Sequence, residues 1–344
     1  MVANKENKAI DLVKAIMALL ILALHTPLLA ENNYILMPLY RLAVPFFFTV
    51  SSYFLFKKLN KCCAKEQIKV VLNYVKRNLI LYFFWFIISF LFVFKERYTY
   101  MFDGKSNFIL ILKKLLFSST WMGSWYIMAT VLCTIIIFLL SKVLKNNLIF
   151  IISFISFLFC CFTCSYAKAF DGVGYDLFQI FCETLECTPS LSLFSGFVFI
   201  SLGKILAEDN KKIYNKSRDT VLFIVFFLFL TAEFFITRKM GWQRADDSLV
   251  MLVPTIYFFV KVILQTNINI GFSKFLRAFS VIVYCSQGIF FAIFNYAFKL
   301  IGWNKTLKVD ICEFLLITVF CIILNSIIIS LEKSKKMKFL RYIH

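Results

Sequence analysis

The sequence predicts an all-α fold, a polytopic membrane helix bundle with about ten transmembrane helices in a single domain spanning residues 1–344. Composition supplies the first observation: 61% of the 344 residues are hydrophobic, 19% are aromatic, and mean hydropathy is +0.81. A soluble domain of this size cannot bury so much apolar surface, so we expect lipid to solvate most of the chain. The second observation is that five prolines and ten glycines leave little room for long irregular linkers.

The third observation is a repeated apolar run. About twenty residues, at about 1.5 Å per residue, cross a bilayer core. The runs of that length are 9–29, 40–59, 77–95, 124–143, 147–165, 191–207, 219–237, 248–265, 277–300 and 312–331. Between the third and fourth runs, lysines interrupt an apolar pattern in FILILKKLLFSSTW (108–121), which predicts an amphipathic helix at the membrane surface.

Charge in the connecting segments predicts the orientation. Segments 57–77 and 204–218 and the tail 331–344 are basic, whereas segment 166–190 is acidic. In membrane proteins, the loops on the cytoplasmic side are usually rich in Lys and Arg. We therefore expect a multi-pass cell-membrane protein whose basic segments and both termini lie in the cytoplasm. No small-residue cleavage site follows the first run, so we expect that run to stay in the bundle.

The same composition narrows the classes of partner. A net charge of +19 on a membrane protein indicates basic loops facing an anionic leaflet, and no nucleic-acid-binding motif accompanies it. Only two histidines are present, and no paired Cys/His set has metal-ligand spacing, which argues against a metal site. Most of the eleven cysteines are expected to be small core residues. Cys182 and Cys187 form a disulfide only if their loop faces an oxidising space.

Ionisable residues inside the first run indicate function. Lys14 and His25 are eleven positions apart, so they project within roughly 20° of each other and stand roughly 16 Å apart along one helix face. Ionisable groups at such depth are costly and mark functional sites. Lys14 is placed to meet an anionic ligand from the cytoplasm, with Asp11 holding its side chain as an i,i+3 partner. The alternative is charge neutralisation at the membrane edge.

Three further residues are candidates for chemistry. His25 is the natural general base, and the alternative is a core histidine hydrogen-bonded across helices. Glu233, expected at the depth of His25, either orients the imidazole, holds a substrate hydroxyl, or lies solvated among headgroups. Arg41 opens the second run and either stabilises a phosphate, carboxylate or oxyanion, or anchors the helix at the interface.

Aromatic and acidic residues at the predicted external ends complete the candidates. Trp125 and Tyr126 are typical of an aromatic belt, and substrate stacking is compatible with that position. Asp246 and Asp247 precede the eighth run and are interpreted as ordinary loop charges.

Several segments together resemble one family. Asp11 and Lys14, followed after ten residues by His25, are similar to the first helix of the integral-membrane acyltransferase-3 family, which has arginine, ten residues and histidine. RLAVPFFFTVSSYFLF, SWYIMATVL, LFSGFVFISLGKIL and FLRAFSVIVYCSQ resemble later helices of that family in the expected order. Lys14, Ser52 and Gln287 depart from it, standing where arginine, glycine and histidine are usual.

The resemblance implies an O-acyltransferase that moves an acyl group, usually acetyl, from cytoplasmic acetyl-CoA to a hydroxyl of an extracytoplasmic glycan or lipid-linked sugar. His25 would activate the hydroxyl or carry the acyl group, and Lys14 with Asp11 would hold the donor. Arg41 would stabilise the oxyanion, with Glu233 as a further catalytic residue. Trp125, Tyr126 and Gln287 would contact substrate, and no metal is implied.

Two other functions remain open. ADDSLVMLVPTIYFFV resembles the membrane region of vancomycin-resistance serine racemases, where that region looks like a substrate-handling module. We expect no racemase domain after the tenth run. A non-enzymatic transporter or flippase of a small polar substrate is therefore the main alternative, and a purely structural membrane partner is the third. Consumption of acyl-CoA separates the first function from both.

Overall fold

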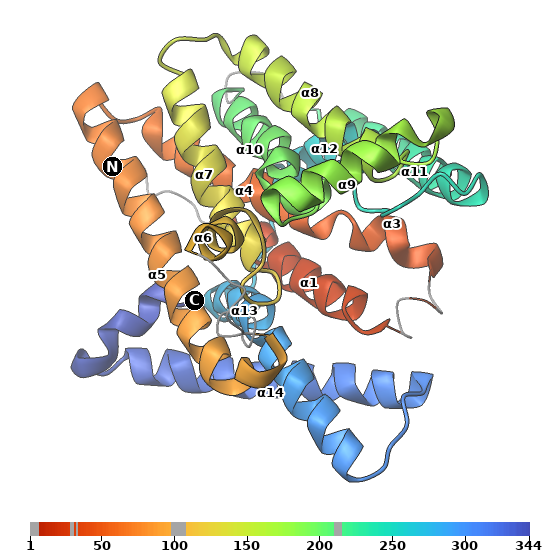
Figure 1. Ribbon diagram of the computed structural model, residues 1–344. Coiled ribbons are helices and arrows are strands. Elements are labelled where there is room, and N and C mark those ends of the chain that lie inside the picture. The colour runs from red at the N-terminus through yellow and green to blue at the C-terminus, as the bar shows by residue number, and fades with distance from the viewer. Residues whose placement is uncertain (1–6, 28–30, 32–33, 98–107, 210–214) are drawn as a thin grey trace.

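The computed structural model describes residues 7–27, 31, 34–97, 108–209 and 215–344, and no strand occurs among them. A helix occupies each predicted run, which confirms the all-α bundle (Figure 1). These helices are α1 (Lys8–Leu24), α3 (Met37–Tyr40) continuing as α4 (Ala43–Leu59), α5 (Ala64–Arg97), α7 (Ser124–Leu140), α8 (Asn146–Thr163), α10 (Leu193–Glu208), α11 (Lys216–Lys239), α12 (Leu252–Leu264), α13 (Ser273–Leu300) and α14 (Leu307–Glu332).

Six helical segments in this part of the chain are long and apolar enough to cross a membrane. They are 34–59, 64–93, 146–163, 216–239, 273–300 and 307–332. Helices α7 and α12 are apolar but shorter. A multi-pass membrane protein follows from these spans.

Shorter helices connect the bundle. Helix α6 (Phe108–Phe117) confirms the helix predicted within 108–121. Helix α9 (Val173–Leu185), in the acidic segment 166–190, was not predicted, although its apolar residues recur at helical spacing. The remaining turns are η1 (Tyr34–Leu36), η3 (Phe170–Gly172), η4 (Pro189–Leu191) and η5 (Lys335–Tyr342).

Several predicted boundaries are wrong, among them the end of α1 and the start of α5. Helix α1 ends at Leu24 rather than residue 29, and His25 is its C-cap. Pro27 explains the early end, because proline lacks an N–H and restricts the residue before it. Helix α5 begins at Ala64, so two thirds of the basic segment 57–77 belong to this helix rather than to a loop. At the other end of α1, the Asn7 side chain accepts hydrogen bonds from the N–H groups of Ala9 and Ile10.

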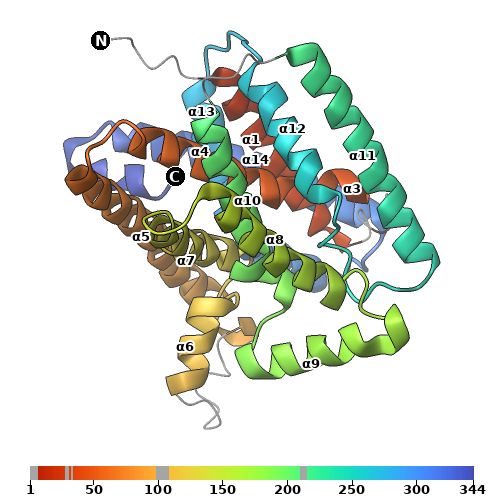
Figure 2. The same cartoon turned by 90° about the horizontal axis from the view of Figure 1, so that it is seen from above.

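The centre of the bundle is built on α4 and α10, which pack closely (Figure 2). A Cβ at Gly203 would lie against the carbonyl oxygen of Thr49, and 2.7 Å from Cβ of Ser52. Ser52 itself is fully buried and donates its hydroxyl to the carbonyl of Ile200 at 2.6 Å. Close helix approach through small residues is the usual packing mode in membranes.

Burial separates inner from outer helices. In its most apolar window α13 is 61% buried, against 17% for α5 and α11. Helices α5 and α11 therefore present their apolar side chains outward, where lipid covers them. Helix α1 lies beside α13 in the interior, so its ionisable residues face protein and cavities.

Candidate functional site

A cavity of about 690 Å³ opens at the end of the bundle where α1 and α13 begin; we call it the basic cavity. Its lining holds five cationic side chains against one side-chain carboxylate, that of Glu332, together with the imidazole of His344. The cations are Lys14, Arg77, Lys274, Arg277 and Arg341. Such an excess of positive charge attracts a polyanion.

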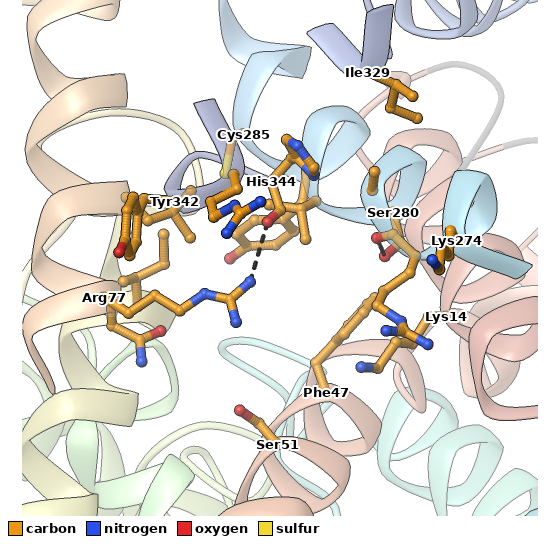
Figure 3. A pocket seen from close by; sticks show the side chains of 18 of the residues that line it. Lys14, Phe47, Ser51, Arg77, Lys274, Ser280, Cys285, Ile329, Tyr342 and His344 are labelled. Atoms are coloured by element: carbon orange, nitrogen blue, oxygen red, sulfur yellow. Dashed lines mark hydrogen bonds between the residues drawn. The ribbon is translucent and has the colours of Figure 1, made fainter. Parts of the chain in front are cut away.

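Lys14 and Arg77 reach into this cavity from opposite walls (Figure 3). Within the described residues, Nζ of Lys14 has no hydrogen bond or ion pair, and it lies 5.7 Å from the ring centre of Phe54. Arg77 donates to the main-chain oxygen of His344 at 3.2 Å. Lys14 is thus available for an anion, and its binding of an anionic ligand stays a prediction.

Asp11 holds a different cation from the one expected. Its carboxylate accepts two hydrogen bonds from Arg277, from Nε at 3.0 Å and from Nη2 at 2.9 Å, and one from Ser273. The planar guanidinium fits a carboxylate with two parallel bonds, which an ammonium cannot form. Asp11 therefore positions Arg277 on α13, and no hydrogen bond joins it to Lys14.

The tail 335–344 covers one side of the basic cavity. Ile343 is buried and its carbonyl accepts a hydrogen bond from Nε1 of Trp85 at 3.2 Å. Nε2 of His344 lies 3.3 Å from Oε2 of Glu332. Burial lowers the pKa of His344, while Glu332 beside it acts in the opposite direction.

A second cavity, of about 500 Å³, lies at the other end of α1; we call it the histidine cavity. It brings together His25, Arg41 and Trp125, which the sequence had placed near one depth. The polar and aromatic residues of its wall include His25, Tyr40, Arg41, Trp125, Ser190, Asp247 and Tyr284.

The loop before α12 supplies two carboxylates that the sequence interpretation had set aside. Asp246 forms an ion pair with Nη2 of Arg41. Asp247 lines the histidine cavity and accepts a hydrogen bond from the hydroxyl of Ser190 at 3.0 Å. Burial raises the pKa of Asp247, against the opposing charge of Arg41. The interpretation of both residues as ordinary loop charges is wrong; adjacent acids at the edge of an apolar run were the available signal.

Tyr284 alone, among the described residues, lines both cavities. Its hydroxyl donates to the carbonyl of Gly123 at 2.6 Å, and its ring centre lies 5.4 Å from that of Tyr126. Gly123 has φ +83°, and a Cβ there would lie 2.9 Å from the Tyr284 hydroxyl oxygen, so only glycine fits. These aromatic side chains form the partition between the cavities.

Trp125 and Tyr126 lie on opposite sides of this partition. Trp125 lines the histidine cavity, whereas Tyr126 lines the basic cavity. Phe48 connects the two, with ring centres 5.8 Å from Trp125 and 4.5 Å from Tyr126. The N-terminal turn of α7 therefore contributes to both cavities.

Three predicted site residues line neither cavity: Asp11, which holds Arg277, and the residues Glu233 and Gln287. The Glu233 carboxylate accepts hydrogen bonds from the Tyr166 hydroxyl at 2.6 Å and from the N–H groups of Val250 and Met251 at 2.7 and 2.8 Å. It thereby fixes the start of α12, which supports a structural role. Gln287 is fully buried, and its Nε2 donates to the carbonyl of Tyr284 at 3.1 Å.

The described residues contain no group of three metal-ligating side chains. All eleven cysteines are free, including Cys182 and Cys187. The ionisable side chains that line the two cavities include two histidines, two carboxylates and a set of cations.

Comparison with known families agrees with this geometry. A family model described as an acyltransferase domain matches residues 7–330. The chain belongs to the acyltransferase 3 family. This acyltransferase 3 protein thus combines a multi-pass helical bundle with two cavities, and its family implies an acyl donor and an acyl acceptor.

Curated relatives of this acyltransferase 3 protein include two proteins of Enterococcus faecalis described as amino-acid racemases. One is 25% identical over 349 residues, covering 95% of this chain and 47% of the racemase. The other is 24% identical over 271 residues, covering 77% of this chain and 37% of the racemase. The chain thus spans less than half the length of these relatives. No solved structure matches it.

Proposed function

We propose that the protein is a membrane O-acyltransferase that carries an acyl group, usually acetyl, from acyl-CoA in the basic cavity to an acceptor hydroxyl in the histidine cavity. The observation that carries the proposal is the meeting of the two cavities at Tyr284. A donor and an acceptor bound on opposite sides of this partition would face each other across one side chain.

Charge supports the assignment of the donor. Coenzyme A carries several phosphate charges, and phosphate is bound by lysine and by forked arginine contacts. Lys14 and Arg77 provide both kinds of group in the basic cavity, and Asp11 fixes Arg277 beside them. By the charge bias of loops, the basic segments that form this end would lie in the cytoplasm, where acyl-CoA is made.

His25 is the proposed base. Its imidazole takes the proton of the acceptor hydroxyl as the hydroxyl oxygen attacks the thioester carbonyl carbon. The C–S bond then breaks, and the CoA sulfur leaves as a thiolate that takes up a proton, giving an ester and free CoA. Nε of Arg41 is buried without a hydrogen bond and supplies a donor for the oxyanion while Nη2 stays on Asp246.

Acyl-CoA binding tests the donor site. Because a charged hydrogen bond to phosphate is lost, Lys14→Ala is expected to raise the KM for acetyl-CoA about tenfold with little change in kcat. Lys14→Arg, which restores charge and adds a fork, should bind at least as well as wild type. Lys239→Ala, exposed at the end of α11, is the control. Wild-type protein in nanodiscs that neither binds nor cleaves acetyl-CoA would contradict the proposed function and favour a transporter.

The role of Tyr284 in separating the two cavities can be tested by removing its hydroxyl. Tyr284→Phe removes the hydrogen bond to Gly123, so water should reach the thioester more readily. We expect acetyl-CoA hydrolysis without acceptor to rise about three- to tenfold, in line with the loss of one hydrogen bond. Tyr296→Phe, at an exposed position of the same helix, is the control. A hydrolysis rate equal to that of wild type would show that Tyr284 does not seal the two cavities.

A further inference from the structure

The two cavities differ in charge. Five cations and one carboxylate line the basic cavity, whereas the ionisable groups of the histidine cavity are His25, Arg41 and Asp247. Asp246 neutralises Arg41 by a direct ion pair. With His25 neutral, Asp247 leaves the histidine cavity with an unbalanced negative charge.

Asp247 is held in place from one side only. Its Oδ2 accepts a hydrogen bond from the Ser190 hydroxyl at 3.0 Å. Ser190 is fixed in turn, because its carbonyl accepts the Ser195 hydroxyl at 2.6 Å. The other oxygen, Oδ1, is buried and accepts no hydrogen bond from the described residues. A buried carboxylate oxygen without a donor is costly, and a bound ligand would remove that cost.

Aromatic rings line the same cavity as this carboxylate. Tyr40, Trp125 and Tyr284 line the same cavity, and all three are largely buried. A cavity lined by a carboxylate and aromatic rings suits a protonated amine, which binds a carboxylate by a charged hydrogen bond and aromatic rings by cation–π attraction. An anionic group in this position would meet the charge of Asp247, while the charge of Arg41 is already balanced by Asp246.

We propose that Asp247 binds the acceptor, and that the histidine cavity selects acceptors carrying a protonated amino group beside the reacting hydroxyl over anionic ones. This inference rests on the proposed function and adds the acceptor's chemistry to it. Asp247 acts as a binding residue, and His25 remains the base.

Three sugars of one ring size and different charge test this selectivity. Glucosamine, glucose and glucuronate are cationic, neutral and anionic, and each is titrated while acceptor-dependent CoA release is measured. Wild type should show the lowest KM for glucosamine and the highest for glucuronate. Asp247→Asn should raise the KM for glucosamine about tenfold or more, the loss of a charged hydrogen bond, with the KM for acetyl-CoA unchanged. Asp171→Asn, exposed and outside both cavities, is the control.

Two results would overturn the inference: an unchanged KM for glucosamine in Asp247→Asn, or glucuronate as the best acceptor of wild type. Asp246→Asn gives an opposite check, because it frees Arg41 and should lower the KM for glucuronate. A wild type that does not cleave acetyl-CoA contradicts the proposed function instead.

A second measurement tests the effect of the Asp247 charge on ligand selectivity without any enzymatic turnover. Leu191 is exposed and lines the histidine cavity, so Leu191→Cys places a thiol there. Its modification by cationic and anionic methanethiosulfonates is followed by mass spectrometry of that peptide. The cationic reagent should react faster, and the rate ratio should fall several-fold when Asp247→Asn is added. A ratio that does not change with Asp247→Asn excludes the carboxylate as the source of selectivity.

Discussion

Replacing His25 with alanine is expected to abolish most acyl transfer, lowering kcat by about 10²- to 10⁴-fold, the usual contribution of a positioned general base. The loss should appear in kcat rather than in the KM for acetyl-CoA. The cationic side chains proposed to bind the donor line the other cavity, at the far end of α1. Steady-state transfer from radiolabelled acetyl-CoA by purified protein in nanodiscs measures it.

Binding of acetyl-CoA is the internal control for this variant. His25→Ala should keep a dissociation constant within about threefold of wild type, which also shows that the bundle is folded. His25→Gln, which keeps a hydrogen-bonding side chain but has no titratable group, should be nearly as inactive. Full transfer activity in a folded His25→Ala protein would refute the role of His25.

The second large effect concerns folding. Gly203→Ala places a methyl group against the carbonyl oxygen of Thr49, at the closest approach of α4 and α10. Because backbone cannot rotate away as a side chain can, we expect a loss of about 3 kcal/mol or more, at or above the upper end for overpacking. Thermal unfolding in detergent, followed by size-exclusion chromatography, measures the loss.

Gly271→Ala is the matched control for this substitution. Nothing lies within 4 Å of a Cβ built at Gly271, and its φ is not in the left-handed region. It should therefore unfold at the wild-type temperature. Equal stability of the two variants would mean that α4 and α10 do not approach as closely as the structure indicates.

Hydropathy was enough to predict most of the fold. Each of the ten apolar runs contains a helix, because the backbone in lipid must satisfy its own hydrogen bonds. The ends of the helices depend on local residue types that hydropathy does not measure. Pro27 shortens α1, and good helix formers before the third run lengthen α5. Helix α9 was missed because its segment was interpreted from charge alone.

Helix geometry was enough to predict the relative positions of two candidate residues, whose roles stay predictions. The shared face of α1 correctly linked Lys14 and His25 to two ends of the molecule, since helix geometry alone fixes that relation. Asp247 and Tyr284 gain their positions from contacts with distant segments, such as Ser190 and Gly123. No spacing within their own segments reveals such contacts. Glu233 lay near the expected end of its helix, but its partners turn it toward α12.

The transporter alternative makes a different prediction at the partition. A carrier must let its substrate pass from one cavity to the other, whereas an acyltransferase needs only the acyl group to cross at Tyr284. Flux of a labelled sugar into proteoliposomes in the absence of acyl-CoA would support transport. We expect no such flux, since the Tyr284–Gly123 hydrogen bond and the packed rings close the path.

The sidedness of transfer tests the central claim most directly. Proteoliposomes are loaded with radiolabelled acetyl-CoA, and the sugar that gives the highest rate of CoA release is supplied only outside. The account predicts labelled acetylated sugar in the outer medium while the vesicles retain their acetyl-CoA. Labelled sugar that forms only when donor and acceptor share one compartment would contradict transfer between two opposed cavities.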